Sequence, residues 1–249
     1  MPMIKQTWLF FTRRLIKSFQ QPAMLFMTLM TPILYLVLFA PLLQRFSGSM
    51  ADVLNQFVPG ILILTAFSAG MGTGWYVVDD DTQDILELFK VMPINSFAYV
   101  LGTVIYDIIG FLVPAAILII GAAWRGFTIH IEGLSVLLLL GTVFALAVSS
   151  LTAWVGLKIR NTGAVGGIVS GIQLPLMLLS GVMLPISYGP HWLRTIAQFN
   201  PMYYVVKGAQ AFNQGTFDSK WGVSGFAVSL VLLLIGLLIS THSYRKLRI

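Results

Sequence analysis

Acidic side chains form the densest set of chemically capable groups in this sequence. Asp79, Asp80 and Asp81 are consecutive, and Asp84 and Glu87 follow shortly after. Carboxylates at this density could bind a divalent cation. A calcium loop, however, spaces its ligands at alternate positions around a glycine, and this run does neither. The run is therefore weak support for a metal site, and we predict no metal-binding residues.

Apolar residues interleave with these acids up to Pro93, and the pattern predicts a short helix that ends there. Negative charge is favoured at helix N-termini, so we expect the aspartates to begin this helix. A helix that exposes both carboxylates and apolar side chains is suited to docking on another protein. The alternative is a solvated acidic loop that lies on its own membrane domain. The expected docking residues are Asp84, Ile85, Leu86, Glu87, Leu88 and Phe89.

The long apolar stretches of the sequence contain a single acidic or basic residue, Asp107. If that stretch starts at residue 98, Asp107 lies roughly 15 Å along the helix. A carboxylate that deep is costly, and it usually faces a partner or a wet cavity. If the stretch starts nearer residue 104, Asp107 sits at the membrane interface. Both placements stay open, and a proton relay would need further acids that the other apolar stretches lack.

Catalytic and nucleotide-binding signatures are missing from the sequence. There is no cysteine, which excludes disulfides, thiol nucleophiles and iron–sulfur clusters. The histidines at positions 130, 191 and 242 are scattered, and we interpret His191 as an interfacial residue. No G-x-x-x-x-G-K-[ST], G-x-S-x-G or H-E-x-x-H pattern occurs. We therefore expect no catalytic residues, no cofactor bound by this chain and no ATPase activity of its own.

Composition indicates the elements that must position these residues. Of 249 residues, 57% are apolar and only 10% are charged, and the mean hydropathy is +0.86. A soluble domain of this size needs more charge to cover its surface. The net charge of +6 sits in short clusters between apolar runs, a pattern that favours a membrane over nucleic acid.

Six apolar stretches are long enough to cross a bilayer. Because backbone in lipid must satisfy its own hydrogen bonds, we interpret all six as helices in an all-α membrane protein with a single domain over residues 1–249. Ten of the 15 lysines and arginines fall on one side if both termini are cytoplasmic, so we predict N-in and C-in. The predicted spans are 24–43, 56–78, 98–123, 133–156, 164–184 and 222–241.

An amphipathic stretch precedes the first span. It predicts a helix along the cytoplasmic membrane surface, with its rings in the interface and its cations near lipid phosphates. Its role is either that of a topology anchor or that of a contact for a partner. The apolar positions are Ile4, Trp8, Phe11, Leu15 and Phe19, and the cations are Arg13, Arg14 and Lys17.

Small residues recur at helical spacing in two spans. Gly163, Gly167 and Gly171 form one ladder, and Gly70 and Gly74 form another. Such a ladder makes a flat groove that another helix backbone can approach closely. The spacing leaves open whether the partner helix belongs to the same chain or to a second copy.

About 36 residues on the outer side follow the fifth span, and they are apolar in parts but interrupted by proline and glycine. A plain hydrophilic loop lacks this pattern. Two short helices that dip back into the outer leaflet fit it better.

Two blocks of the sequence carry a family pattern. The more specific is Ser180-Gly181 to Pro185, then Pro190 to Leu193, then Asn200-Pro201 with Tyr203 to Val206. The second is Leu86-Glu87-Leu88 with Pro93. With these blocks, the sequence resembles permease subunits of type-2 ABC exporters, which include drug-export permeases of the daunorubicin type and polysaccharide exporters. One departure is Asp79 to Gln83, where the family often has a Glu- and Arg-rich start with a glycine.

The resemblance implies that two copies of this chain pair through the Gly163, Gly167 and Gly171 ladder in the plasma membrane of a prokaryote. Two separate ATPase subunits, which carry ATP and magnesium, would dock on Asp84–Phe89, a cytoplasmic coupling helix. The implied outer gate consists of Ser180, Gly181, Pro185, Trp192, Pro201 and Tyr204.

The apolar walls favour an amphipathic or lipid-like substrate, such as a hydrophobic drug. Two other classes remain. An ion-coupled carrier would need midplane ionisable groups, for which Asp107 is the one candidate. A non-transporting assembly protein would not need an exposed docking segment.

Overall fold

The computed structural model describes residues 2–21, 49–83, 95–182 and 189–247, together with residues 26, 29–30, 32–34, 37–38, 41, 85 and 186. Within these residues the regular secondary structure is helical, with no strand. The helices are α1 (Met3–Phe19), α3 (Met50–Thr82), α5 (Ser96–Trp124), α6 (Ile131–Ile159), α7 (Thr162–Leu178), α8 (His191–Ala197), α9 (Pro201–Asn213) and α10 (Lys220–Leu247).

Four of these helices, α3, α5, α6 and α10, are long and apolar enough to cross a membrane. They contain the predicted spans 56–78, 98–123, 133–156 and 222–241. The first predicted span, 24–43, lies largely outside the described residues. The fifth, 164–184, is corrected: α7 ends at Leu178, and the chain then turns through Gly181, whose φ of +78° suits a glycine.

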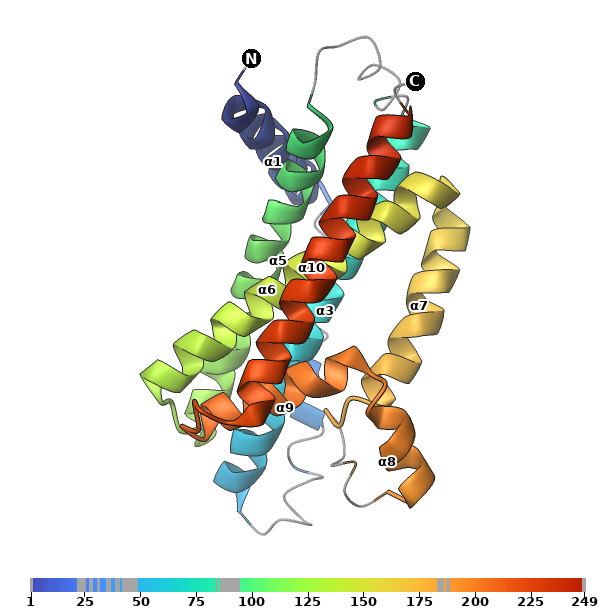
Figure 1. The fold of residues 1–249 in the computed structure, drawn as a ribbon. Helices are drawn as coiled ribbons and strands as arrows, with labels where there is room; N and C mark the ends of the chain where they lie inside the picture. Colours follow the sequence, from blue (N-terminus) through green and yellow to red (C-terminus); the bar gives the residue numbers. More distant parts are fainter. Residues whose placement is uncertain are drawn as a thin grey trace.

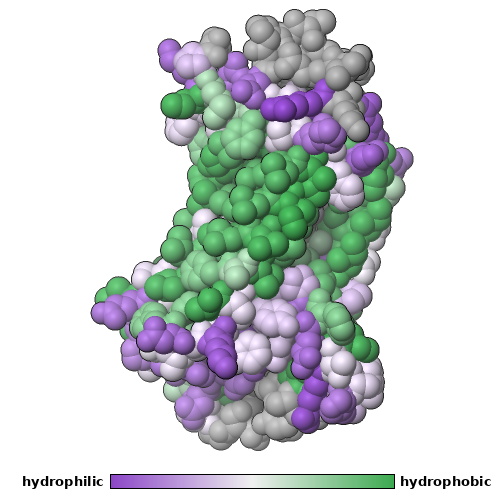
Figure 2. Space-filling view, in the orientation of Figure 1, coloured by the Kyte–Doolittle hydropathy of each residue, from purple (hydrophilic) through white to green (hydrophobic). Residues whose placement is uncertain are grey.

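The helices form an elongated bundle (Figure 1). Helix α6 packs against both α3 and α10 at the centre of the bundle, and α5 and α1 lie along one side. Helix α7 stands on the other side, with its upper end joined to α6. Both chain ends lie at one end of the bundle, and α8 and α9 lie at the other. A broad apolar band crosses the middle of the molecule, with hydrophilic residues above and below it, as a bilayer requires (Figure 2).

Glycines bring α3 and α6 into close contact. A Cβ atom on Gly70 would lie 2.6 Å from the carbonyl oxygen of Ala145, and one on Gly156 would lie 2.6 Å from that of Gly74. The Thr152 hydroxyl adds a hydrogen bond to the Gly70 carbonyl at 2.7 Å. The Gly70 and Gly74 ladder therefore serves packing within the chain.

Two short helices, α8 and α9, follow α7, as the interrupted sequence predicted. Asn200 caps α9 by accepting from the Met202 N–H at 2.9 Å, and Pro201 occupies the first turn, where its missing donor costs nothing. The Asn200 amide also donates to the Leu176 carbonyl at 2.7 Å. That carbonyl is in the last turn of α7 and has no partner within the helix. Asn200 therefore ties α9 to the end of α7.

Candidate functional site

The three consecutive aspartates lie in the last turn of α3. The prediction that they begin the following helix was therefore wrong. A helix C-terminus disfavours negative charge, so these carboxylates need cations from outside α3. Among the described residues, three cations supply that charge, and we call these carboxylates and cations the charged junction. Its members are Asp79, Asp80, Asp81, Arg13, Lys17 and Arg160.

Asp80 is the buried centre of the charged junction. Its two oxygens accept hydrogen bonds from Arg13 at 2.7 and 2.9 Å, a bidentate pair, and the Tyr99 hydroxyl donates to it at 3.3 Å. Partial burial lowers the pKa of Arg13, but the hydrogen bonds and negative charge of Asp80 outweigh this, so that the pKa is raised. Lys17 forms an ion pair with Asp79 beside it.

Asp81 connects α3 to the corner between α6 and α7. Its carboxylate lies 3.8 Å from Nε of Arg160, which ends α6 in the left-handed conformation at a φ of 50°. Asn161 follows and caps α7 by accepting from the Ala164 N–H at 2.9 Å. The last turn of α3 is thus linked to α1 through two carboxylates and to the corner between α6 and α7 through the third.

The cations of α1 face the protein, which corrects the expectation that they lie near lipid phosphates. Arg13 and Lys17 meet the carboxylates of α3, and Arg14 is fully buried. The apolar residues on the opposite face are exposed: Ile4, Trp8, Leu9, Ile16 and Phe19. The carboxylates and aromatic rings of the protein are held in place beside α1. They therefore bind these cations in preference to lipid phosphates.

Asp107 is 1% exposed and lies at the meeting point of α1, α3, α5 and α6. Arg14 donates to it at 2.7 and 3.3 Å, and the hydroxyls of Thr73 and Ser149 also donate to it. Arg14 donates further to the Thr103 carbonyl. Asp107 therefore faces a cation and two donors, which is the arrangement a buried carboxylate needs.

Aromatic rings enclose the Arg14 guanidinium. Its central carbon lies 5.0 Å from the centroid of the Tyr76 ring and 4.5 Å from that of Tyr106, within the range of cation–π attraction. Lys17 also lies over Tyr76, at 5.2 Å. These contacts could not be predicted from the sequence, because they join residues of α1 to side chains far along the chain.

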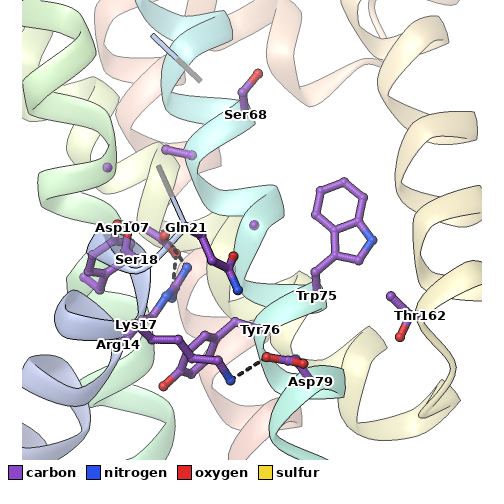
Figure 3. Close-up of a pocket in the computed structure, with 14 residues that line it drawn as sticks. Arg14, Lys17, Ser18, Gln21, Ser68, Trp75, Tyr76, Asp79, Asp107 and Thr162 are labelled. Atoms are coloured by element: carbon purple, nitrogen blue, oxygen red, sulfur yellow. Dashed lines mark hydrogen bonds and ion pairs between the residues drawn. The ribbon is translucent and has the colours of Figure 1, made fainter. Parts of the chain in front are cut away.

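A cavity of about 360 Å³ opens beside this network (Figure 3). Its lining includes Arg14 and Lys17 of α1, Gln21 just after α1, and Thr162 at the start of α7. The ring of Trp75 points across the open space toward α7. The described wall of the cavity thus combines paired charges, the Gln21 amide and hydroxyls with large aromatic surfaces. Such a wall suits a molecule that has both a polar and an apolar part.

Most of the predicted docking segment, Asp84 and Leu86 to Phe89, lies outside the described residues. Ile85 is described, is partly buried and packs against a cluster that includes Phe10 and Tyr244. No group of three His, Cys, Asp or Glu side chains arranged to hold a metal occurs in the part of the chain that the structure describes.

The glycine ladder of α7 is exposed. No described atom lies within 4 Å of a Cβ built on Gly167 or Gly171, and a Cβ on Gly163 would contact only the Asn161 side chain. Unlike the ladder of α3, this one is not packed against another described helix. The pattern alone could not distinguish the two ladders.

The predicted outer-gate residues lie at the end of α7 and along α8 and α9, except Pro185, which is outside the described residues. Ser180 is buried and donates to the Met177 carbonyl, and the Tyr204 hydroxyl donates to the Gln198 carbonyl at 2.9 Å. Trp192 is exposed on α8. These residues stand at the end of the bundle opposite α1 (Figure 1).

Comparison with known proteins identifies the family. The family model described as "ABC-2 type transporter" matches residues 5–212. The chain belongs to this family. It is therefore a multi-pass membrane protein of the ABC transporter permease type, as the sequence motifs predicted.

Individual relatives agree with the family match. The transport permease ycf38 of Cyanophora paradoxa is 22% identical, over 98% of this chain and 89% of its own length. The daunorubicin resistance ABC transporter permease protein DrrB1 of Streptomyces coeruleorubidus is 23% identical, over 78% of this chain and 70% of its own length. The ycf38 permease of Porphyra purpurea is 21% identical, over 89% of this chain and 82% of its own length.

Proposed function

We propose that this chain is the membrane subunit of an ABC exporter that moves an amphipathic or lipid-like substrate out of the cytoplasm. A separate ATPase subunit supplies the energy and carries the ATP and magnesium, and this chain binds no cofactor and catalyses no reaction. The single observation that carries the proposal beyond the family is the charged junction, in which the last turn of α3, directly before the predicted docking segment in sequence, contacts α1 and the α6–α7 corner.

The junction gives a physical route for the coupling. The docking segment begins directly after the last turn of α3, so a force on it acts first on Asp79, Asp80 and Asp81. Asp80 holds α1 through a short, bidentate and partly buried pair with Arg13, and Asp79 adds a pair with Lys17, whereas Asp81 reaches Arg160 only at the longer distance of 3.8 Å. We infer that α1 moves with α3, while the corner before α7 follows more loosely.

The cavity beside Arg14 supports the substrate class. It offers Trp75, Tyr76 and Tyr106 for an apolar part, and the paired charges of Lys17 and Asp79 for a polar part. The daunorubicin resistance permease is a relative of this chain, and its name points to an amphipathic drug as one possible kind of substrate.

The assembly we propose contains two copies of this chain and two ATPase subunits in the plasma membrane of a prokaryote. Each copy forms a single domain with six spans and both termini in the cytoplasm. The exposed ladder of Gly163, Gly167 and Gly171 supports pairing of the copies through α7, because no described helix covers it. Helices α8 and α9 would re-enter the outer leaflet and form the outer gate.

Efflux from liposomes tests this function. The chain is reconstituted with its ATPase, and release or uptake of a fluorescent amphiphile is followed with ATP and with a non-hydrolysable analogue. We expect directional movement that needs hydrolysis. Transport that runs on a proton gradient without the ATPase would instead support an ion-coupled carrier, and it would refute the proposal.

A further inference from the structure

A second cavity, which we call the α7 cavity, lies between α7 and the body of the bundle. Its volume is about 200 Å³, and it is bounded by side chains of α3, α6, α7, α9 and α10. Its floor contains the buried residues Phe67, Phe144, Val148 and Met202. Its rim contains Ile168 and Ile172, which are half exposed on α7.

The described residues in the wall of the α7 cavity offer nothing to a polar ligand. Thr152 is the only residue with a polar side chain among the described residues that line it, and its hydroxyl already donates to the Gly70 carbonyl at 2.7 Å. A buried water needs two to four polar partners, so water is not held here. In another protein, an apolar cavity of about 150 Å³ stays dry and takes up benzene.

The apolar surface around the α7 cavity indicates which kind of molecule could occupy it. Leu232 of α10 lines the cavity, and its neighbours on α10 form an exposed apolar surface. Apolar residues gather both at the centre of the molecule, over α10, and at its right edge, over α7, within the same apolar band (Figure 2). The exposed residues of α10 are Leu230, Val231, Leu234, Ile235 and Leu238. In a bilayer this surface is covered by hydrocarbon, so an acyl chain is the nearest apolar molecule to the rim.

We propose that the α7 cavity is a binding site for one acyl chain of a membrane lipid. The acyl chain enters past Ile168 and Ile172 and lies against Val148 and Met202. The site recognises the hydrocarbon and not the headgroup, because the described wall presents no free polar atom. The bound chain supports α7 from behind, on the face away from its exposed glycines, and replaces the packing contacts that a void would lose.

Photolabelling with a lipid tests this proposal. The full chain is reconstituted in phosphatidylcholine liposomes that contain a trace of phosphatidylcholine with a diazirine midway along one acyl chain. After illumination, the labelled residues are mapped by mass spectrometry. We expect adducts on Val148 and Met202, which are 5% and 0% exposed and out of reach of lipid that stays outside the protein. Adducts confined to the outward residues of α10 would overturn the proposal.

Two variants should exclude an acyl chain from the α7 cavity. Val148→Phe fills its floor, and Ile172→Trp blocks its rim from a half-exposed position where folding is not at risk. An acyl chain that loses the contacts of two methylene groups binds with about tenfold lower affinity. The yield of Met202 adducts should therefore fall by about that factor. The matched control Val231→Phe, on the outer face of α10, should leave them unchanged. Unchanged adducts in both filling variants would contradict the proposal.

Two further arms separate this occupant from others. A phosphatidylglycerol probe with the same labelled chain should give the same adducts, and a strong headgroup preference would refute a site that recognises the chain alone. If side chains of a second copy filled the cavity, Met202 adducts would persist in isolated monomers and vanish in cross-linked dimers. That result would also overturn the proposal.

Discussion

A carboxylate inside an apolar helix is tolerated only when cations and donors surround it, and Asp107 meets this condition through Arg14, Thr73 and Ser149. The sequence singled out Asp107 but could not choose between a buried and an interfacial position. Its cation lies 93 residues earlier in the chain, on a helix predicted to face lipid. Hydropathy and spacing report single segments, and they carry no information on which segments meet.

The Arg14–Asp107 pair should dominate stability at the residue scale. Arg14→Ala leaves a buried carboxylate without its cation, which should cost about 3–5 kcal/mol. The matched control Lys17→Ala removes a cation from the more exposed Asp79 and should cost about 0–1 kcal/mol. Thermal unfolding of the purified protein compares the two. If both variants melt alike, Asp107 is not held by Arg14 in the way the structure shows.

The ion pair between Arg160 and Asp81 is longer than the one between Arg14 and Asp107. We expect it to matter more for transmitting the motion of the ATPase than for stability. It is partly exposed at 3.8 Å, so Arg160→Ala should change the free energy of unfolding by less than about 1 kcal/mol. We expect the variant to hydrolyse ATP normally with its partner while it transports less substrate. Transport equal to that of the native protein would remove Arg160 from the coupling route.

Among the elements, the long apolar helices were the easiest to predict. Helices α3, α5, α6 and α10 each contain an uninterrupted apolar run, and the bilayer thickness alone sets their minimum length. The end of α7 was missed because the apolar composition continues past Leu178 into the turn at Gly181. The signals for a helix end are a small residue and a left-handed glycine, and hydropathy does not register them.

The two glycine ladders make a matched pair for substitution. Gly70→Leu would push a side chain into the Ala145 carbonyl, so we expect the α3–α6 contact to break and the monomer to misfold. Gly167→Leu meets no described atom and should leave the monomer folded, but it should weaken pairing between copies. Size-exclusion chromatography with cross-linking separates these effects. A Gly167→Leu protein that pairs normally would place the interface elsewhere.

Across the whole molecule, family membership followed from motifs, whereas the route of coupling required the structure. The Leu86-Glu87-Leu88 pattern and the proline-rich block after α7 matched the family without any knowledge of contacts. The charged junction could not be predicted, because the acids were expected to begin the next helix. Sequence order places Asp79 to Asp81 beside the docking segment, but only the fold brings α1 and the α6–α7 corner to them.

The docking segment should be separable from the folded bundle. Phe89→Asp should lower co-purification of the ATPase without changing the melting temperature of the membrane subunit. Phe97→Asp serves as a control for an added charge on a nearby helix start outside the docking segment. An ATPase that binds the Phe89→Asp protein as tightly as the native one would show that docking occurs elsewhere.

If a separate ATPase drives this chain, the two proteins should purify together. The tagged chain is purified in mild detergent from its native membranes, and its stoichiometric companions are identified by mass spectrometry. We predict a soluble subunit with a Walker A motif, at close to one copy per membrane subunit. A chain that purifies alone, and that still transports in liposomes without ATP, would contradict the account.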